Sequence, residues 1–141
     1  MDGQERFVYA GSKIGSLFIY KVNDITWNLH KILNDHYSEI SSIAISNTIN
    51  VVATSSFDGY VNVYTFPDTK IFRSLSNLNT PIEKVFLSAY PIPCLVLHCG
   101  KSLKCYSING KLIYCDIEEY DILSPIVFTD SNFNDYIVIV L

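Results

Sequence analysis

The sequence lacks long apolar runs and the features of a secretion signal. Its apolar segments are all shorter than the roughly 18 residues that a membrane-spanning helix needs. The opening residues MDGQERF carry neither the basic nor the apolar region of a signal peptide, and no Asn-x-Ser/Thr site is present. We therefore expect a cytoplasmic protein without a transmembrane segment.

Charge is also scarce. Charged residues make up 17% of the chain and the net charge is −4, which argues against a nucleic-acid-binding surface. Four acidic residues gather at Asp116, Glu118, Glu119 and Asp121, either as a docking patch for a basic partner or as a solvated connection, and the second interpretation is favoured. Apolar residues reach 49%, so the composition predicts a folded core.

Motifs of catalysis and cofactor binding are missing. The chain has no Gly-rich phosphate loop, no Gly-x-Ser-x-Gly elbow and no His-Glu-x-x-His sequence. We predict no enzyme activity, no catalytic or cofactor-binding residues and no cofactor. His30 and His98 fall on expected strands, where packed or edge positions are favoured over metal ligands.

The four cysteines are Cys94, Cys99, Cys105 and Cys115. A metal site or disulfides are the alternatives to reduced thiols. The spacings of 5, 6 and 10 positions contain no Cys-x-x-Cys pair, and zinc sites prefer closer pairs on loops. The pattern favours reduced thiols packed as small apolar groups in strands, without a metal.

What is present is a repeat. Tyr20, Tyr64 and Tyr106 each close a short alternating strand, at intervals of 44 and 42 residues. A period of about 40–45 residues is typical of a β-propeller blade, and a closed ring needs about 4–8 blades. The chain of 141 residues holds little more than three. It therefore predicts an incomplete, all-β propeller with blade portions near residues 1–33, 34–75, 76–117 and 118–141.

Alternating apolar segments and turn residues predict thirteen strands. They lie near residues 6–11, 16–22, 26–33, 39–46, 50–56, 60–66, 70–75, 82–88, 94–99, 102–107, 111–117, 124–129 and 136–141. Phe57-Asp58-Gly59 and Asn109-Gly110 predict hairpin turns between them. One helical turn over 74–79 is the single alternative to strand or loop.

The middle repeat resembles a WD40 repeat. In that family a His before the first strand, a Ser or Thr in the second, an Asp in the turn and a Trp six residues later form a buried hydrogen-bonded tetrad. His36, Thr54, Asp58 and Tyr64 hold these positions, with Tyr64 in place of the usual Trp. The resemblance implies a structural tetrad. A catalytic His–Asp pair is the disfavoured alternative, because no nucleophile belongs to the set.

The two flanking repeats are degenerate. The position of the turn Asp is taken by Ile14 in the first and by Gly100 in the third, although Gly15 keeps the turn in the first. The assignment of these two repeats rests mainly on their regular spacing from the middle repeat, and less on their own residues.

A narrower resemblance covers residues 36–140. The run SSFDGYVNVYTFPDTKIFRSL (residues 55–75) is similar to the propeller of BEACH-domain proteins, in the branch of neurobeachin and the LPS-responsive beige-like anchor. FLSAYPIPCLVLHCGKSLKCYSINGKLI (residues 86–113) is similar to the same family, and Asp130 and Asp135-Tyr136 fit less specifically.

This resemblance implies a C-terminal propeller that serves as a scaffold in vesicle traffic. Its partners would be proteins, first the rest of a BEACH-type chain, through which it would associate peripherally with vesicle membranes. Nothing matches the family's kinase-anchoring helix. The alternative is a WD40 subunit of an unrelated assembly, for example a ubiquitin-ligase substrate receptor.

Two expectations concern surfaces. The loops near 13–15, 34–38 and 57–59 form the favoured binding face, where Tyr37 and Phe57 either anchor a partner or pack against a neighbouring blade. Three blades also leave apolar flanking faces that a ring would bury, with side chains such as those of 43–45, 51–53 and 61–63 on them. The chain stops within an apolar segment, 137–141, so we expect a fragment or a strand edge that pairs with another chain.

Overall fold

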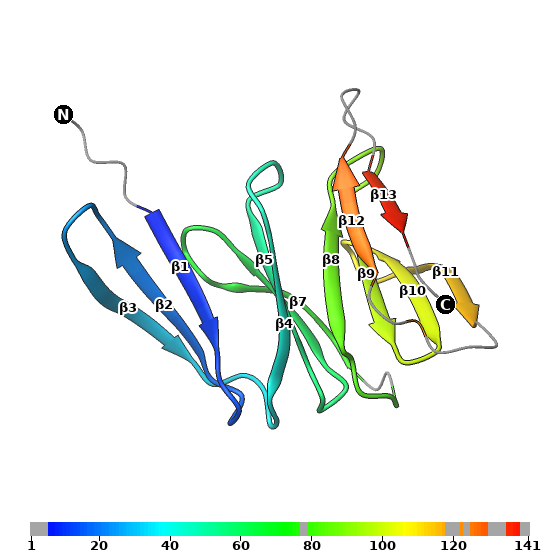
Figure 1. Ribbon diagram of the computed structural model, residues 1–141, viewed down its shortest axis with the longest axis horizontal. Helices are drawn as coiled ribbons and strands as arrows, with labels where there is room; N and C mark the ends of the chain where they lie inside the picture. Colours follow the sequence, from blue (N-terminus) through cyan, green and yellow to red (C-terminus); the bar gives the residue numbers. More distant parts are fainter. Residues whose placement is uncertain (1–5, 77–78, 118–121, 123–124, 130–134, 139–141) are drawn as a thin grey trace.

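The computed structural model describes residues 6–76, 79–117, 122, 125–129 and 135–138. These residues form antiparallel sheets joined by short turns (Figure 1). Within the described ranges no helix is long and apolar enough to cross a membrane.

Thirteen strands follow one another along the chain. They are β1 (Arg6–Gly11), β2 (Leu17–Val22), β3 (Trp27–Leu33), β4 (Ile40–Ser46), β5 (Val51–Ser56), β6 (Val61–Thr65), β7 (Ile71–Leu75), β8 (Lys84–Ser88), β9 (Cys94–Cys99), β10 (Ser102–Ser107), β11 (Leu112–Ile117), β12 (Ile126–Thr129) and β13 (Asp135–Val138). Each lies where the sequence predicts a strand. The helical turn considered for 74–79 is wrong at its start, because Ser74 and Leu75 pair with β6.

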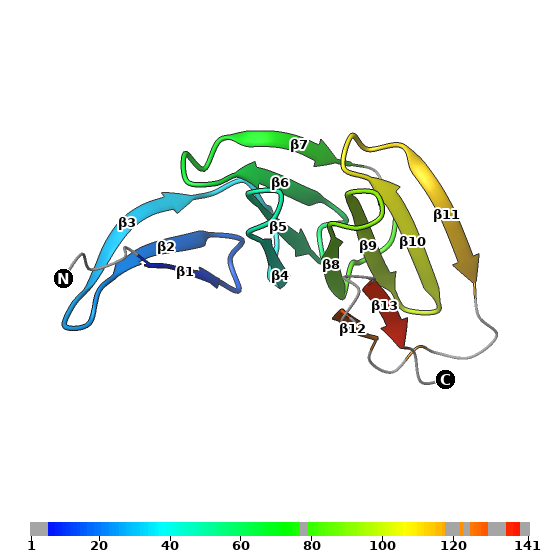
Figure 2. The same ribbon diagram turned by 90° about the horizontal axis from the view of Figure 1, so that it is seen from above.

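The strands form four sheets in chain order. The first sheet is β1-β2-β3, the second β4-β5-β6-β7, the third β8-β9-β10-β11 and the fourth β12-β13. Figure 2 shows the first three along an arc, with β3, β7 and β11 on its convex side and β4 and β8 on its concave side. The described strands thus form an open arc of blade-like sheets, as the sequence predicts.

Two apolar clusters hold neighbouring sheets together. Between the second and third sheets, the buried side chains are Val51, Ala53, Val61, Val63, Leu75, Ile82, Val85, Leu95, Leu97 and Cys99. The expectation that apolar side chains of 51–53 and 61–63 lie on an exposed flanking face is wrong, because the third sheet covers them. Between the first and second sheets, Leu17, Ile19, Ile40 and Tyr64 form a smaller cluster. Alternate residues of each strand meet one neighbouring sheet, which is why the period of two in the sequence is informative.

The three repeated tyrosines lie at equivalent irregularities. The pairing shifts between Ile19 and Tyr20, between Val63 and Tyr64, and between Cys105 and Tyr106. Each shift leaves one residue of the outer strand without a pairing partner, namely His30, Phe72 and Ile113 in turn. A β-bulge of this kind bends the strand and redirects a side chain. The same bulge therefore occurs beside each of the three tyrosines, once in each of the first three sheets.

Candidate functional site

The site is built on the face of the second sheet that meets the first. Thr54 of β5, Asn62 of β6 and Ser74 of β7 lie directly opposite one another in the pairing register. The Ser74 hydroxyl donates to Asn62 Oδ1 at 2.6 Å. These polar side chains form a row across the sheet, and the first two are fully buried, so each needs a partner.

His36 supplies a partner for this row from the segment between β3 and β4. Its Nε2 lies 2.8 Å from Thr54 Oγ1 and its Nδ1 lies 3.2 Å from Asp58 Oδ2. An ionised carboxylate only accepts hydrogen bonds, so Nδ1 donates to Asp58. In the neutral ring Nε2 is then an acceptor and receives the Thr54 hydroxyl. The Asn62 amide also points at Nε2, at 3.4 Å.

Asp58 ties this histidine to the turn between β5 and β6. Its Oδ2 also accepts from the Tyr37 backbone N–H at 2.8 Å, and its Oδ1 accepts from the Tyr60 N–H at 2.9 Å. Gly59 follows with a φ of 82°, a conformation that suits glycine. One carboxylate therefore links two separate loops.

Tyr64 lies with the other three residues of the predicted tetrad, and its hydroxyl has an acceptor of its own. It is buried beside Thr54 and Asn62, but its hydroxyl donates to Asp35 Oδ2 at 3.1 Å. The Asn62 amide donates to the backbone carbonyl of the same Asp35 at 3.2 Å. The structure brings His36, Thr54 and Asp58 into one bonded group and gives Tyr64 a different acceptor.

Asp35, Asn62 and Ser74 were not singled out by the sequence analysis. One signal was available for Asn62, because it is a polar residue between two apolar ones, Val61 and Val63. Ser74 follows Arg73 and gave no such signal. Asp35 gave no such signal, since an acidic residue in a loop is ordinary.

The geometry defines what this group can do chemically. Asp58, His36 and Thr54 are bonded in the order of an acid, a base and a hydroxyl, but the Thr54 side chain is 0% exposed. A substrate has no route to that hydroxyl in this conformation. The arrangement satisfies buried polar groups and holds two loops in place.

Tyr37 and Phe57 lie beside this group at the same end of the strands. Tyr37 is 89% exposed and Phe57 is 44% exposed, and Tyr37 meets the ring of Tyr60 edge-on at 6.4 Å between centroids. A hollow of about 260 Å³ opens next to them, lined by Phe57, Asp58, Gly59, Tyr60, Asn79, Thr80 and Pro81. Packing against a neighbouring sheet, the alternative weighed for both aromatics, does not bury either one.

The first and third repeats lack the aspartate of the turn but still have a glycine with positive φ there. Gly15 has a φ of 89° and Gly100 a φ of 59°. A Cβ on Gly15 would lie 2.4 Å from the His36 carbonyl oxygen, so this glycine lets the first turn approach the His36 loop closely.

The remaining candidates occupy scattered positions. In the ranges that the structure describes, no three His, Cys, Asp or Glu side chains come together as metal ligands. The cysteines are free thiols; Cys99 is buried, but Cys115 on the outer strand β11 is exposed and is not the core residue expected for it. His98 is buried in β9 with Nε2 bonded to the Gly100 carbonyl. Of the acidic cluster, Glu118, Glu119 and Asp121 lie outside the described residues.

Comparison with known proteins extends the fold. No family model and no curated protein matches the chain. Among solved structures, a chain in "Crystal Structure of Mitotic Checkpoint Complex" matches with a TM-score of 0.74 at 18% identity, over 85% of this chain and 39% of that one. The β-propeller domain of Cps50 (Swd1) from Myceliophteria thermophila matches with a TM-score of 0.66 at 15% identity, over 79% and 35%. U3-55K matches with a TM-score of 0.69 at 13% identity, over 82% and 35%.

These neighbours are WD40 β-propellers, and the described sheets have that fold. The chain spans less than two fifths of the length of each. Nothing in these comparisons supports the narrower resemblance to BEACH-domain proteins.

Proposed function

We propose that this chain, whose sheets are WD40 propeller blades, is a non-catalytic module that binds another protein. One observation carries the proposal: two exposed aromatic residues stand on two loops that a single carboxylate links. Phe57 lines a hollow, and Tyr37 lies against Tyr60, which lines the same hollow. Exposed aromatic side chains at a concave site are the usual anchors of protein interfaces.

The loops are held before a partner arrives. Asp58 bonds the backbone of Tyr37 and of Tyr60, and its own position is held by the buried ring of His36. A preorganised surface loses less conformational entropy on binding, which supports the same assignment. The His36–Thr54–Asp58 group, with Tyr64 beside it, then serves as the structural support of the binding face.

We further propose a BEACH-type scaffold as the setting. The motif over residues 55–75 favours this setting. The module would then belong to a larger chain that acts in vesicle traffic and associates peripherally with vesicle membranes. A WD40 subunit of another multiprotein assembly is the second candidate; one structural neighbour comes from a mitotic checkpoint complex. The reading frame upstream distinguishes them, because a BEACH domain there supports the first and a different module refutes it.

The binding face is tested by mutation. Tyr37→Ala with Phe57→Ala removes both exposed rings, and Tyr114→Ala removes an exposed ring from the outer strand β11 as a matched control. Affinity capture followed by mass spectrometry should return a partner with the unmodified chain and with the control. The double variant should retain about tenfold less of it. Equal retention by the double variant would refute this face.

A further inference from the structure

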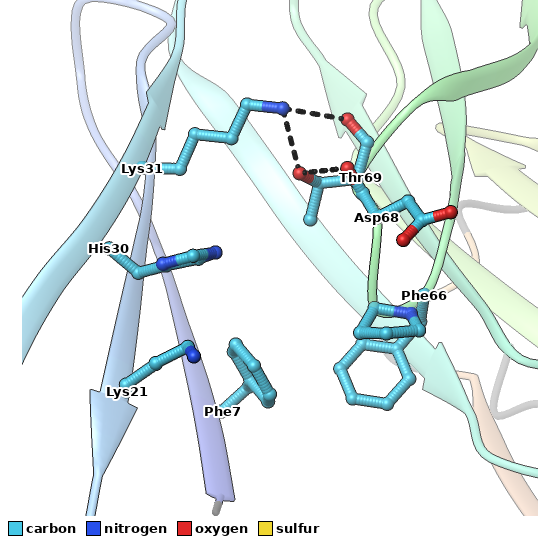
Figure 3. Close-up of a pocket in the computed structure, with 8 residues that line it drawn as sticks. Phe7, Lys21, His30, Lys31, Phe66, Asp68 and Thr69 are labelled. Carbon is cyan, nitrogen blue, oxygen red and sulfur yellow. Dashed lines mark hydrogen bonds between the residues drawn. The ribbon is translucent and has the colours of Figure 1, made fainter.

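A second cleft opens at the opposite end of β6, between the first and second sheets. It has a volume of about 540 Å³. Figure 3 shows its two walls. Phe7, Lys21, His30 and Lys31 form the wall of the first sheet, and Phe66, Pro67, Asp68 and Thr69 of the β6–β7 turn form the other.

Contacts between the sheets bound this cleft at two ends. At one end, Lys31 Nζ donates to Thr69 Oγ1 at 2.9 Å and to the Thr69 carbonyl at 3.3 Å. At the other, the rings of Phe7 and Phe66 meet edge-on with centroids 5.1 Å apart. The Lys31–Thr69 hydrogen bonds and the Phe7–Phe66 ring contact therefore join the two walls at the ends of the cleft, and the space between these contacts stays open.

The bulge in β3 brings His30 and Lys31 onto the same wall. In a regular strand His30 and Lys31 would point to opposite faces of the sheet. Because His30 has no pairing partner, both side chains line the same cleft. His30 meets the Phe7 ring edge-on at 5.8 Å, and Lys21 Nζ stands 5.7 Å from the centre of that ring.

The neighbouring pair of sheets provides an internal comparison. The equivalent cleft between the second and third sheets is lined by Ile49, Asn50, Val51, Thr65, Phe66, Phe72, Pro93 and Ile108. There the bulged residue is Phe72 where the first sheet has His30, and Thr65 follows the repeated tyrosine where the first sheet has Lys21. The fold accepts uncharged residues at both positions, so packing does not account for the basic pair.

We propose that this cleft binds a carboxylate side chain, together with an adjacent apolar side chain, from an acidic segment of a partner protein. Lys21 and His30 meet the carboxylate, and the rings of Phe7 and Phe66 contact the apolar side chain. Asp68 lies across the cleft from Lys21 and His30 (Figure 3), and Lys31 is already bonded to Thr69. The cleft thus holds two lysines, Lys21 and Lys31, and one acidic residue, Asp68, and a net single positive charge fits a singly charged carboxylate better than a doubly charged phosphate.

This proposal goes beyond the aromatic face around Tyr37 and Phe57. The two sites lie at opposite ends of the β6 strand, since one adjoins the turn before it and the other the turn after it. The two sites share no lining residue, and neither assignment depends on the other.

Fluorescence anisotropy with the full chain tests the cleft. The probe is a fluorescein-labelled Glu-Phe-Glu-Phe-Glu peptide, and the same peptide with glutamine in place of glutamate removes only the charge. The variant Lys21→Thr with His30→Phe installs the residues that the second sheet carries at the same positions. Lys111→Thr removes an exposed lysine from the corresponding turn of the third sheet as the control.

We expect the acidic peptide to bind the unmodified chain and the control, and to bind the double variant at least about tenfold more weakly. The glutamine peptide should bind the unmodified chain as weakly as the acidic peptide binds the double variant. If the double variant does not fold, Lys21→Thr and His30→Phe singly should each weaken binding about threefold.

Three outcomes would overturn the proposal. They are equal binding of the acidic peptide by the unmodified chain and a folded variant, the absence of any binding, and equal affinity for both peptides. Binding to phosphatidylcholine–phosphatidylserine vesicles without binding to the peptide would also overturn it, because the cleft would then serve a membrane surface.

Discussion

The hydroxyl of Tyr64 donates to the carboxylate of Asp35, the residue that precedes His36, at 3.1 Å. Burial, followed by the charge of Asp35, raises the pKa of Tyr64 well above its usual range, so the phenol keeps its proton at neutral pH. A phenol carries its donor at the tip of the ring, which allows it to reach an acceptor outside the His36–Thr54–Asp58 group. Tyr64 thus links the second sheet to the segment between β3 and β4 by a hydrogen bond separate from those of Asp58.

Tyr64→Phe removes this hydrogen bond and leaves the ring. We expect a loss of about 1 kcal/mol in the free energy of unfolding, measured by urea titration. Tyr114→Phe is the matched control, because its hydroxyl donates to Asp116 at the same distance on an exposed strand. A variant of Tyr64 as stable as this control would show that the buried bond contributes nothing.

Asp58→Ala removes the acceptor of two backbone N–H groups and of the His36 ring. Buried donors left without partners cost about 1–3 kcal/mol. Thermal denaturation followed by circular dichroism should show a lower midpoint than for the unmodified chain, whereas Asp24→Ala in an exposed turn should leave it unchanged. An unaltered midpoint, in a chain that melts cooperatively, contradicts the structural role of this group.

Gly15→Ala tests the close approach of the first turn to the His36 loop. The new Cβ would lie 2.4 Å from a backbone oxygen, at a φ of 89°. Gly59→Ala carries the same kind of φ, 82°, but its Cβ would meet nothing nearer than 3.5 Å. The control should cost about 1–2 kcal/mol for the backbone alone, and Gly15→Ala should cost more. Equal losses of unfolding free energy for the two variants, measured by urea titration, would show that the His36 loop moves to accommodate the new Cβ.

The face of the first sheet that points away from the second should make the isolated chain associate. Cross-strand pairing gathers apolar side chains on it: Val8, Ala10, Phe18, Tyr20, Val22, Trp27, Leu29 and Ile32. Trp27 is 65% exposed, and none of the described strands covers this face. Apolar patches of this extent associate or bind partners, and a repeat unit depends on its neighbours for stability.

Light scattering and an apolar fluorescent dye measure this association. Trp27→Lys with Leu29→Lys should lower both the scattering and the dye signal, whereas Ile14→Lys in an exposed turn should not. A monodisperse, cooperatively melting monomer of the unmodified chain would contradict the prediction.

Tyr9 makes stability fall at alkaline pH. Its hydroxyl is buried without a hydrogen-bond partner among the residues that the structure describes, and burial raises its pKa to about 12. The unfolded chain loses this proton first, near pH 10, so ionisation of Tyr9 leaves stability unchanged below that pH and lowers it as pH rises from about 10 to about 12. Tyr9→Phe should be at least as stable at pH 7 and should lose less stability between pH 10 and 12 in urea titrations. Parallel pH profiles would show that Tyr9 does not contribute.

Local features of the sequence were sufficient for the strands and turns. Alternation of apolar and polar residues located each strand, since a side-chain period of two is a property of the strand itself. Asp58-Gly59 and Asn109-Gly110 mark tight turns for an equally local reason, because few residues accept the backbone angles that such turns require. The interval between Tyr20, Tyr64 and Tyr106 set the repeat, and with it the all-β propeller class.

Only the tertiary structure decided how side chains distant in sequence meet. The acceptor of Tyr64, the linkage of two loops through Asp58, the exposure of Tyr37 and the exposed position of Cys115 depend on which strands lie beside one another. The basic cleft depends further on a bulge at His30, which a residue-by-residue pattern does not contain because a bulge is a property of two paired strands. Periodicity therefore determined the elements of this protein, and the registers between them determined its sites.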